Sequence, residues 1–568
     1  MRPRCEVAER RPGGQAREGF EVRDEGSDHE VSALWHQGRF FGALAAATRQ
    51  QARDGENYAS HAMIAKIESA LGLRVRAAVS WASAMRFAED QPEAHVALGS
   101  LAFEEGNVAR AKELYGNALS LSPEFVPALV SLSVACLHTN DFDAARRYAS
   151  SALRVQPGLP EALLCRARAE VACGNLNLAE MDITRLQQDN YRPDEVRLLE
   201  CDLSRQRGDY EVALCVAAEL CDSYPAAQDP LTAFRRGFLE FRKAAPDRFR
   251  DFAEALELVP APMSNDRLEL NISPSGINRR AGRVGQVDVI VPVHNAPEAV
   301  DDCLSAVLRH ATDTIAKIIL VDDASDPETV GRMRRLAARD KRIETIRLET
   351  RVGFTRALGA GLVQSKAPYF VALNSDTIVP TGWLDRLRDG FETRPDVAMV
   401  GPMSNNAAWQ NVFPVFDNLG TFAVRDIDPT DLSTAFAQAE VTTPGFVPTP
   451  LVHGFCAMVD RQVFDLVGGL DAEAFPEGYG EFQDLSIRLR QQGKICLVAS
   501  DCLVWHARGA SISARRRGAL SERARGVLYR KYSALNYLFI EMEACANEAL
   551  DTLRDRLEPC LRGIGKQP

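Results

Sequence analysis

The chain has 568 residues, of which 46% are hydrophobic and 26% are charged, fractions typical of a soluble protein, and its length predicts several domains. A formal net charge of −11 argues against nucleic acid as the main partner. The sequence contains no run of 18 apolar residues, so we expect no bilayer-spanning segment. Thirteen cysteines without a Cys-x-x-Cys pair indicate reduced thiols, which predicts a cytoplasmic protein.

The N-terminal segment, residues 1–30, is rich in Arg, Glu, Gly and Asp and has few apolar side chains. Such a segment buries too little apolar surface to offset the entropy of ordering, so we expect it to be disordered. Its charged start has no apolar core, which does not fit a secretory signal.

The next segment contains a repeat of 34 residues that begins near residue 31. Six alanines keep this spacing, which predicts a small residue where two helices cross. These alanines are Ala43, Ala77, Ala111, Ala145, Ala179 and Ala213. Five positions before each alanine stands a residue that tolerates the positive φ of a helix end. These residues are Gly38, Gly72, Gly106, Asn140, Gly174 and Gly208.

Other residues mark the helix ends within the repeat. Four residues that directly follow these turns are predicted to cap helix N-termini, because their side chains accept backbone N–H hydrogen bonds. They are Asn107, Asp141, Asn175 and Asp209. Pro123 and Pro157 are predicted to end the second helix of two successive repeats, because proline cannot continue a helix.

The pattern over residues 31–245 resembles the tetratricopeptide repeat. The resemblance implies an all-α solenoid of stacked helix pairs, whose concave face binds peptides or other extended partners. We expect a protein partner or the acceptor of a reaction on this face. A purely architectural role, in dimerisation or spacing, is the alternative.

Residues 246–286 are predicted to form a linker, because Pro, Asn, Ser, Gly and Arg replace the repeat pattern there. Beyond it, β-prone runs alternate with helical stretches, which predicts a mostly parallel sheet covered by helices on both faces. The predicted strands are residues 287–293, 317–321, 342–348 and 369–373. The predicted helices are residues 298–310 and 327–340 and the stretch after Gly353.

Polar residues follow two of these strands. Asp322 and Asp323 end one, and Asn374, Ser375 and Asp376 end another. The carboxyl ends of parallel strands form the edge where open α/β sheets bind ligands. Carboxylates there, with a nearby histidine, can hold a divalent cation against a diphosphate, which predicts a metal-assisted transferase that uses a nucleotide-linked donor.

Four motifs follow one another along this part of the chain. They are VIVPVHN (289–295), VDDASD (321–326), NSDT (374–377) and GYGEFQDLSIRLRQQG (478–493) with LVWH (503–506). In this order and spacing they resemble the family 2 glycosyltransferases of the GT-A fold, inverting enzymes that use nucleotide-sugar donors. The resemblance covers residues 287–512 and implies a nucleotide-diphospho-sugar transferase domain with a Rossmann-like mixed sheet.

The resemblance also implies a donor site. Its residues are Pro292, His294, Asn295, Asp322, Asp323, Ser325, Arg351, Gly353, Asn374 and Ser375. Carboxylates accept hydrogen bonds from a pyrimidine N–H and from ribose hydroxyls, which favours a UDP- or dTDP-linked sugar. Gly353 lets the chain pass close to the ligand, and Arg351 can face a phosphate, although the family more often has Asn at that position.

The metal and the catalytic base follow from the same resemblance. Asp376 and His506 are expected to bind Mn²⁺ or Mg²⁺, with Asn374 in place of the first acid of the D-x-D motif. The base is Glu481 or Asp484, and the sequence leaves both open. Phe482 stands where the family commonly has an acid.

The acceptor side is expected around Trp409, His453 and Gly454, although Trp409 can equally be a core residue. Residues 513–568 form a predicted C-terminal helical region that packs on the catalytic domain. Apolar residues around 537–540 are a candidate for peripheral contact with the inner face of the membrane.

Together these features predict a glycosyltransferase that moves a sugar to a glycan or protein acceptor, with glycan assembly the more general role of the family. An alternative is an interaction protein whose repeats bind a partner and whose transferase domain is inactive, as the replacements Asn374 and Phe482 allow. A sugar nucleotidyltransferase would need a Gly-rich basic loop after the first strand, and residues 292–297 are not one.

Overall fold

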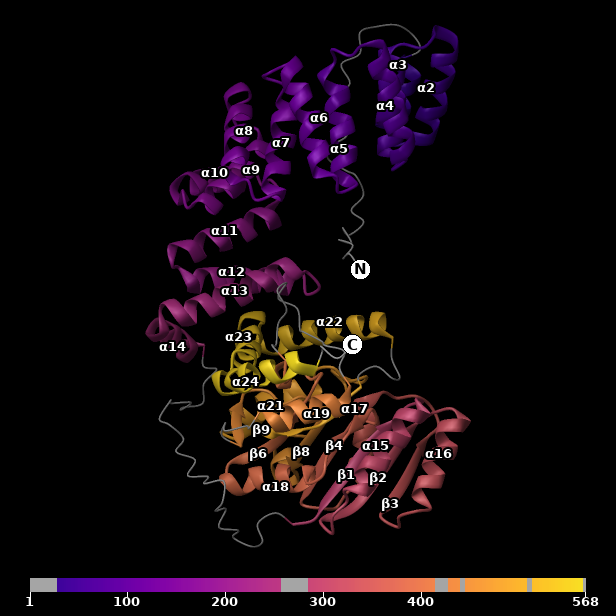
Figure 1. Ribbon diagram of the computed structural model, residues 1–568, viewed down its shortest axis with the longest axis vertical. Helices are drawn as coiled ribbons and strands as arrows, with labels where there is room; N and C mark the ends of the chain where they lie inside the picture. The colour runs from indigo at the N-terminus through magenta and orange to yellow at the C-terminus, as the bar shows by residue number, and fades with distance from the viewer. Residues whose placement is uncertain (1–27, 257–284, 414–427, 440–444, 508–512, 565–568) are drawn as a thin grey trace. The chain divides into compact units, whose positions relative to one another are not determined.

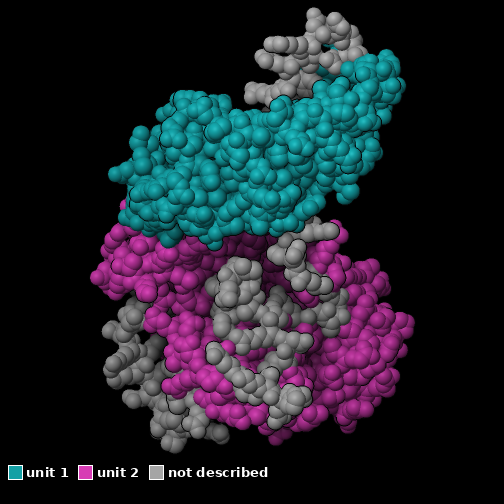
Figure 2. Space-filling model, turned by 45° about the horizontal axis from the view of Figure 1, so that its top comes forward, with its two compact units in different colours: residues 1–207 teal, residues 208–568 magenta. Residues whose placement is uncertain are grey.

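The computed structural model describes residues 28–256, 285–413, 428–439, 445–507 and 513–564. Helices form the N-terminal part of the chain, and a sheet with helices around it forms the C-terminal part (Figure 1). Contacts divide the chain into two compact units, residues 1–207 and residues 208–568 (Figure 2). Most of the segment predicted to be disordered and most of the predicted linker, residues 1–27 and 257–284, lie outside the described residues.

The first unit consists of helices that pack against their neighbours in the chain. They are α1 (Asp28–His36), α2 (Phe40–Asp54), α3 (Tyr58–Ala70), α4 (Arg74–Phe87), α5 (Pro92–Glu104), α6 (Val108–Leu121), α7 (Val126–His138), α8 (Phe142–Val155), α9 (Pro160–Cys173), α10 (Leu176–Gln188) and α11 (Pro193–Arg207). The predicted all-α fold of this region is confirmed.

The repeat positions explain why these helices begin, end and pack where they do. Each of the six repeat alanines is at most 1% exposed, so neighbouring helices approach closely there. The residue five positions before each alanine has a positive φ, from 57° at Asn140 to 83° at Gly106. α6 ends at Leu121 and α8 at Val155, each two residues before a proline.

The predicted N-caps differ from one repeat to the next. The side chains of Asn107 and Asp141 each accept a 3.2 Å hydrogen bond from the backbone N–H three residues later. Asn175 and Asp209 also stand at N-cap positions, but within the described structure their side chains make no capping hydrogen bond. The amide of Asn175 instead donates to the carboxylate of Glu170 at 2.6 Å.

Three helices open the second unit. They are α12 (Tyr210–Ser223), α13 (Gln228–Ala244) and α14 (Pro246–Ala255), and the last lies within the range predicted as a linker. Aromatic rings join them to α23 (Ala534–Cys545), near the end of the chain. The ring centroids of Phe238 and Phe249 lie 4.9 Å and 5.2 Å from that of Phe539. These helices therefore share a core with the C-terminal helices.

The described strands of the second unit form an eight-stranded mixed sheet in the order β3-β2-β1-β4-β8-β6-β9-β7. Their bounds are β1 (Val287–Val293), β2 (Ile315–Asp323), β3 (Ile343–Leu348), β4 (Tyr369–Leu373), β6 (Val397–Met403), β7 (Phe446–Thr449), β8 (Cys456–Asp460) and β9 (Ile495–Leu503). β1 to β4 pair in parallel, as the alternating pattern predicted, and β8 is antiparallel to β4 and β6. β5 (Thr377–Ile378) and β10 (Trp505–His506) form a separate antiparallel pair.

Helices cover both faces of this sheet, which confirms the predicted α/β fold. On one face Val289 and Val291 of β1 share a core with α15, α16 and α18, and on the other Ile290 shares a core with α17, α20 and α21. These helices are α15 (Pro297–Arg309), α16 (Pro327–Ala337), α17 (Phe354–Gln364), α18 (Trp383–Thr393), α20 (Arg461–Leu466) and α21 (Glu481–Gln491). Between them in the chain lie η1 (Ala408–Gln410) and α19 (Pro429–Gln438).

The C-terminal region consists of α22 (Ala514–Tyr532), α23 and α24 (Glu548–Ile564), and it packs on the sheet unit as expected. The membrane contact considered for residues 537–540 is wrong, because Tyr537, Leu538, Phe539 and Ile540 are all buried inside the protein. Among the helices that the structure describes, none is both long enough and apolar enough to cross a membrane.

Candidate active site

A cavity of about 300 Å³ lies at the carboxyl ends of β1, β2 and β4. Most of the residues predicted from the motifs line it, although they come from distant parts of the sequence. They are Pro292, His294, Asp323, Arg351, Gly353, Asn374, Ser375, Asp376, Trp409, His453, Gly454, Glu481 and His506. The fold therefore brings the predicted donor, metal, base and acceptor residues to one place.

Asp323 connects the end of β2 to the loop that follows β3. Its two carboxylate oxygens accept hydrogen bonds from the backbone N–H groups of Val352, at 2.6 Å, and Gly353, at 2.9 Å. Each oxygen keeps a second lone pair for another donor. His294 is fixed nearby, because its Nδ1 donates to the carbonyl of Asp323 at 2.7 Å.

Three of the predicted donor residues, Asn295, Asp322 and Ser325, are outside the set of described residues that line the cavity. Asp322 accepts a 2.8 Å hydrogen bond from the backbone N–H of Ser325 and forms an ion pair with Arg347. Ser325 Oγ accepts from the backbone N–H of Asn295 at 3.0 Å. These side chains connect the loops after β1 and β2, so they hold the two loops in place without lining the cavity.

Gly353 lines the cavity, and the structure gives a further reason for a glycine at this position. Its φ is +89°, and a Cβ at this position would lie 2.6 Å from the carbonyl oxygen of Pro476. The glycine therefore lets the loop after β3 pass against the backbone of the loop before α21.

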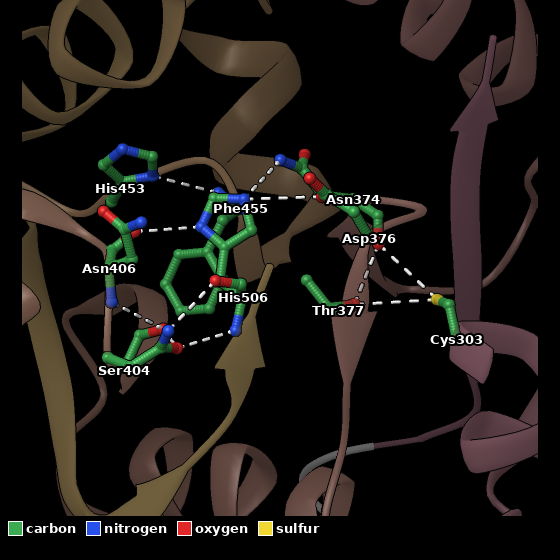
Figure 3. A network of polar contacts seen from close by, with 10 residues as sticks. Cys303, Asn374, Asp376, Thr377, Ser404, Asn406, His453, Phe455 and His506 are labelled. Atoms are coloured by element: carbon green, nitrogen blue, oxygen red, sulfur yellow. Dashed lines mark hydrogen bonds and ion pairs between the residues drawn. The ribbon is translucent and has the colours of Figure 1, made fainter. Parts of the chain in front are cut away.

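Asp376 and His506 meet because β5 and β10 pair, with Thr377 opposite His506. Asp376 Oδ1 lies 3.4 Å from His506 Nε2. Figure 3 shows the imidazole of His506 beside the ring of Phe455. Asn374 and Asp376 lie on the side of the imidazole that carries Nε2. The Asn374 amide nitrogen is 3.3 Å from the same Nε2 atom.

The orientation of His506 is set by two asparagines. Its Nδ1 lies 2.9 Å from the carbonyl oxygen of Asn406, which can only accept, so Nδ1 carries the proton. In the neutral ring Nε2 is then the lone-pair nitrogen that faces Asp376. Asn405 holds the His506 backbone, accepting from its N–H at 2.8 Å and donating to its carbonyl at 3.1 Å. The sequence pointed to neither asparagine as a support for the histidine.

The donor atoms here suit a hard divalent cation, because they offer a carboxylate and an imidazole with a fixed lone pair. Within the described residues no group of three or more His, Cys, Asp or Glu side chains is placed to hold a metal. Asp376 and His506 are the two side chains here that could hold such an ion.

Glu481 is the first residue of α21 and lines the cavity although it is only 6% exposed. Gly478, Tyr479 and Gly480 before it all have positive φ, so the loop turns sharply into the helix. Among the described residues its Oε2 has no hydrogen-bond partner. Burial raises the pKa of Glu481 to about 7, against the opposing effect of the backbone N–H groups of Glu481 and Gly480.

Asp484, three residues later, is outside the set of described cavity-lining residues and is fully buried. Its carboxylate pairs with Arg488 at 2.7 Å and Lys531 at 2.5 Å, and it accepts from the Tyr532 hydroxyl at 2.7 Å. It therefore fastens α22 to α21.

Phe482 stands where the family commonly has an acid, and the structure shows its packing role. It is buried, and a Cβ at Gly454 would overlap its ring. Gly454 is thus needed for this close packing between the loop before β8 and α21. Its neighbour His453 is positioned by its backbone N–H, which donates to Gln410 at 2.6 Å.

Trp409 lies in η1 and is only 2% exposed, although it lines the cavity. Its ring centroid is 6.2 Å from that of His453. In the described part of the chain its indole N–H has no hydrogen-bond partner. Trp409 is therefore buried as a core residue is, and it also lines the cavity.

The C-terminal helices form a wall of the same cavity, which the motifs did not indicate. The residues concerned are Ser521, Ala524, Arg525 and Leu528 of α22 and Tyr537 and Glu541 of α23. Their helical spacing places each set on one face. The sequence signal that could have indicated this wall is the presence of charged residues on those faces, in a region predicted to pack on the domain.

Comparison with known proteins agrees with these observations. Residues 288–468 match the family model described as glycosyl transferase family 2, and residues 102–169 match a model of the tetratricopeptide repeat. The chain therefore carries a family 2 glycosyltransferase domain and tetratricopeptide repeats, as the motifs predicted. The matched ranges include Asp376 but neither Glu481 nor His506.

Similar curated proteins include an uncharacterized glycosyltransferase of Haemophilus influenzae, 26% identical over 20% of this chain and 35% of its own length. Glycosyltransferase GlyG of Streptococcus pneumoniae is 24% identical over 21% of this chain and 39% of its own. The chain thus covers less than half of the length of these relatives. Among solved structures, a mannosyltransferase of Pyrobaculum calidifontis with GDP-Man and Mn²⁺ is 17% identical, covers 60% of this chain and 88% of its own, and has a TM-score of 0.34.

Proposed function

We propose that this protein transfers a sugar from a UDP- or dTDP-linked donor to an acceptor hydroxyl, with inversion at the anomeric carbon. The observation that carries the proposal is that a buried carboxylate, Glu481, and the Asp376–His506 pair line one cavity at the carboxyl edge of the sheet. A base and a diphosphate site on one cavity are what a single displacement at a sugar carbon needs.

The donor would lie along the strand edge. The free lone pairs of the Asp323 carboxylate suit ribose hydroxyls or a pyrimidine N–H, and His294 is fixed beside it. Arg351 lines the cavity and supplies positive charge for a phosphate. Asn295, Asp322 and Ser325 would act by holding the two loops in place.

Asp376 and His506 would hold a divalent cation, with Asn374 beside them. Such a cation, when bound, neutralises charge that develops on a departing diphosphate. The residues fit this role because Asn406 keeps the lone pair of His506 Nε2 turned toward Asp376.

Glu481 would act as the general base. Its unpartnered Oε2 takes the proton of the acceptor hydroxyl as the acceptor oxygen forms its bond to the anomeric carbon. The bond from that carbon to the diphosphate breaks in the same step, and its electron pair leaves with the diphosphate. A pKa of about 7 leaves much of the base ionised near neutral pH, and assistance of this kind contributes roughly 10² to 10⁴ in rate.

The test is release of UDP or dTDP from a panel of UDP- and dTDP-sugars with Mn²⁺, with and without sugar acceptors. We expect turnover with at least one donor, and its loss in Asp376→Asn. Asp385→Asn, on the exposed face of α18, is the matched control and should behave as the unaltered protein. If neither UDP nor dTDP binds and no donor reacts, the proposal is wrong.

A second candidate function is a binding role for the repeats with an inactive transferase domain. Two residues favour it, Asn374 in place of an acid of the metal motif and Phe482 in place of an acid of the base motif. Nucleotide binding without turnover of any donor in the panel would support this candidate.

The setting of the reaction is part of the proposal. The cysteines in the described part of the chain form no disulfide, which suits a reducing cytoplasm. The acceptor is a glycan or a protein, and polysaccharide assembly is the proposed setting. The repeat region would present a protein partner.

A further inference from the structure

We propose that the face of the cavity formed by α21, η1 and α23 is an acceptor subsite built for a sugar unit, so that the acceptor is a glycan. The inference rests on the proposed transfer reaction and names its second substrate. The polar atoms that the protein leaves without partners on this face carry the argument.

Glu541 provides the main observation. It lines the cavity, it is only 5% exposed, and within the described residues its Oε2 has no hydrogen-bond partner. Its other oxygen accepts from the Tyr537 hydroxyl at a long 3.5 Å. A buried carboxylate oxygen without a donor is costly, so a ligand that brings an O–H group gains an interaction the protein does not offer.

Trp409 and Glu481 provide the complementary atoms. In the described structure the indole N–H of Trp409 and the Oε2 of Glu481 are also without partners, and both side chains are buried and line the same cavity. η1, which holds Trp409, packs against α23, which holds Glu541. The face thus combines two acceptors of hydrogen bonds and one donor.

This pattern selects a chemical class. A sugar ring carries several hydroxyls on a rigid frame, and each can donate to a carboxylate or accept from an N–H. Its apolar C–H faces can pack on Leu528 and Ala524, which line the same wall. A Ser or Thr side chain brings one hydroxyl and cannot serve all three groups. An ionised lipid phosphate brings acceptors but no O–H donor for the unpartnered Oε2 atoms of Glu541 and Glu481.

Arg525 keeps this wall in shape as a positioning residue. It is a cavity-lining residue of α22 and donates to the carbonyl of Pro225, in the turn between α12 and α13, at 3.2 Å. Burial lowers the pKa of Arg525, but acidic neighbours, Glu541 first, outweigh it and raise the pKa overall. The positive charge of Arg525 thus balances Glu541 and leaves its Oε2 available for a neutral hydroxyl.

The test uses the full chain with UDP and Mn²⁺ and measures binding of methyl glycosides of glucose, galactose and N-acetylglucosamine by saturation-transfer NMR. We expect at least one glycoside to bind and Glu541→Gln to weaken it about tenfold or more. Glu543→Gln is the matched control. Glu543 is another carboxylate of α23, half-buried and 3.9 Å from Arg490, and it is not among the described residues that line the cavity. The glycoside affinity of Glu543→Gln should stay within twofold of that of the unaltered protein.

A second variant, Trp409→Phe, keeps a smaller aromatic ring and removes the N–H, so it tests the subsite independently if Glu541→Gln fails to fold. We expect a three- to tenfold weaker affinity for the glycoside. UDP affinity and melting temperature report whether each variant is folded with an intact donor side.

The outcomes separate the two proposals. Glycoside binding that neither variant changes overturns the subsite. So does turnover with a Ser/Thr peptide or a polyprenyl phosphate while no glycoside binds. Glycoside binding that depends on Glu541, with no donor turned over, keeps the subsite and removes the transfer reaction.

Discussion

On the strand side of the cavity the polar side chains are held by the protein, whereas on the helix side several are left without partners. Asp323 is held by two backbone N–H groups and His506 by the carbonyl of Asn406. Glu481, Trp409 and Glu541 each have a polar atom without a partner among the described residues. Each such atom costs about 1 to 3 kcal/mol unless a ligand supplies the missing hydrogen bond.

In the proposed reaction, this difference lets one cavity bind two substrates in different ways. Prearranged groups with fixed hydrogen bonds suit the part of a substrate that is constant, such as a nucleoside diphosphate. Unpartnered groups gain most from a ligand that fits them, so they discriminate among acceptors. The five predictions below concern four residues, which lie on one side, support it or stand where the two sides meet.

The largest effect is expected on the strand side, at Asp376. Asp376→Ala should reduce transfer by about 10³-fold or more, because it removes the carboxylate that faces His506 Nε2. Transfer rates at saturating donor and Mn²⁺ measure this, and the melting temperature should stay within a few degrees. Full activity in this variant would remove the metal assignment.

The next effect concerns Glu481, the proposed base, on the helix side. Glu481→Gln should lower kcat by roughly 10² to 10⁴, because an amide cannot take the proton. Since burial raises the pKa of Glu481 to about 7, the rate of the unaltered protein should rise with pH through about 7 and then level off. An unchanged kcat, or a rate that falls across this range, would contradict the role of Glu481.

The same raised pKa has a consequence for stability. A carboxyl whose pKa is higher in the folded than in the unfolded state stabilises the fold at low pH. That stabilisation is lost as the pH rises from about 4.5 toward 7. Melting curves at pH 5 and pH 8 should therefore show a smaller loss of stability in Glu481→Gln than in the unaltered protein.

The next prediction concerns Asp484, which fastens α22 to α21 on the helix side. Asp484→Ala should destabilise the fold by about 3 to 5 kcal/mol, because it leaves Arg488 and Lys531 near a buried site without their shared carboxylate. Chemical denaturation measures this, with Glu473→Ala, an exposed member of a surface ion pair, as the control within about 0.5 kcal/mol. A variant as stable as the control would show that Asp484 does not fasten α22.

The smallest effect is expected at Gly353, where the two sides meet. Gly353→Ala should cost about 2 kcal/mol, because its φ is positive and the new Cβ would press on the Pro476 carbonyl. Gly382→Ala has a similar φ of +74° but open space around its Cβ, so it should cost about 1 kcal/mol. Equal costs for the two variants would show that the close approach contributes nothing.

The features that the sequence predicted best are local. The repeat alanines and the turn residues predict the helix pairs directly, because the role of each position is set within one repeat. The strand ends also report the cavity edge, because parallel strands deliver their last residues to one side. The pairing of Asp376 with His506 could be predicted from the family motifs and follows in the structure from the pairing of β5 with β10.

Features that depend on packing between distant segments could not be predicted. The sequence left Glu481 and Asp484 as alternatives, and only the partners contributed by α22, Lys531 and Tyr532, distinguish a cavity residue from a buried anchor. Asn406 and Glu541 were missed for the same reason, because their neighbours lie far away in the chain.

The hydrogen bond from Arg525 to Pro225 bears on how small a working fragment can be. A protein trimmed to begin at the first strand would lose that carbonyl, and the ring of Phe539 would lose Phe238 and Phe249. An apolar surface on α23 would then meet water, and the wall next to Glu541 would lose its anchor. A fragment that keeps this wall intact therefore includes the turn before α13, together with α13 and α14.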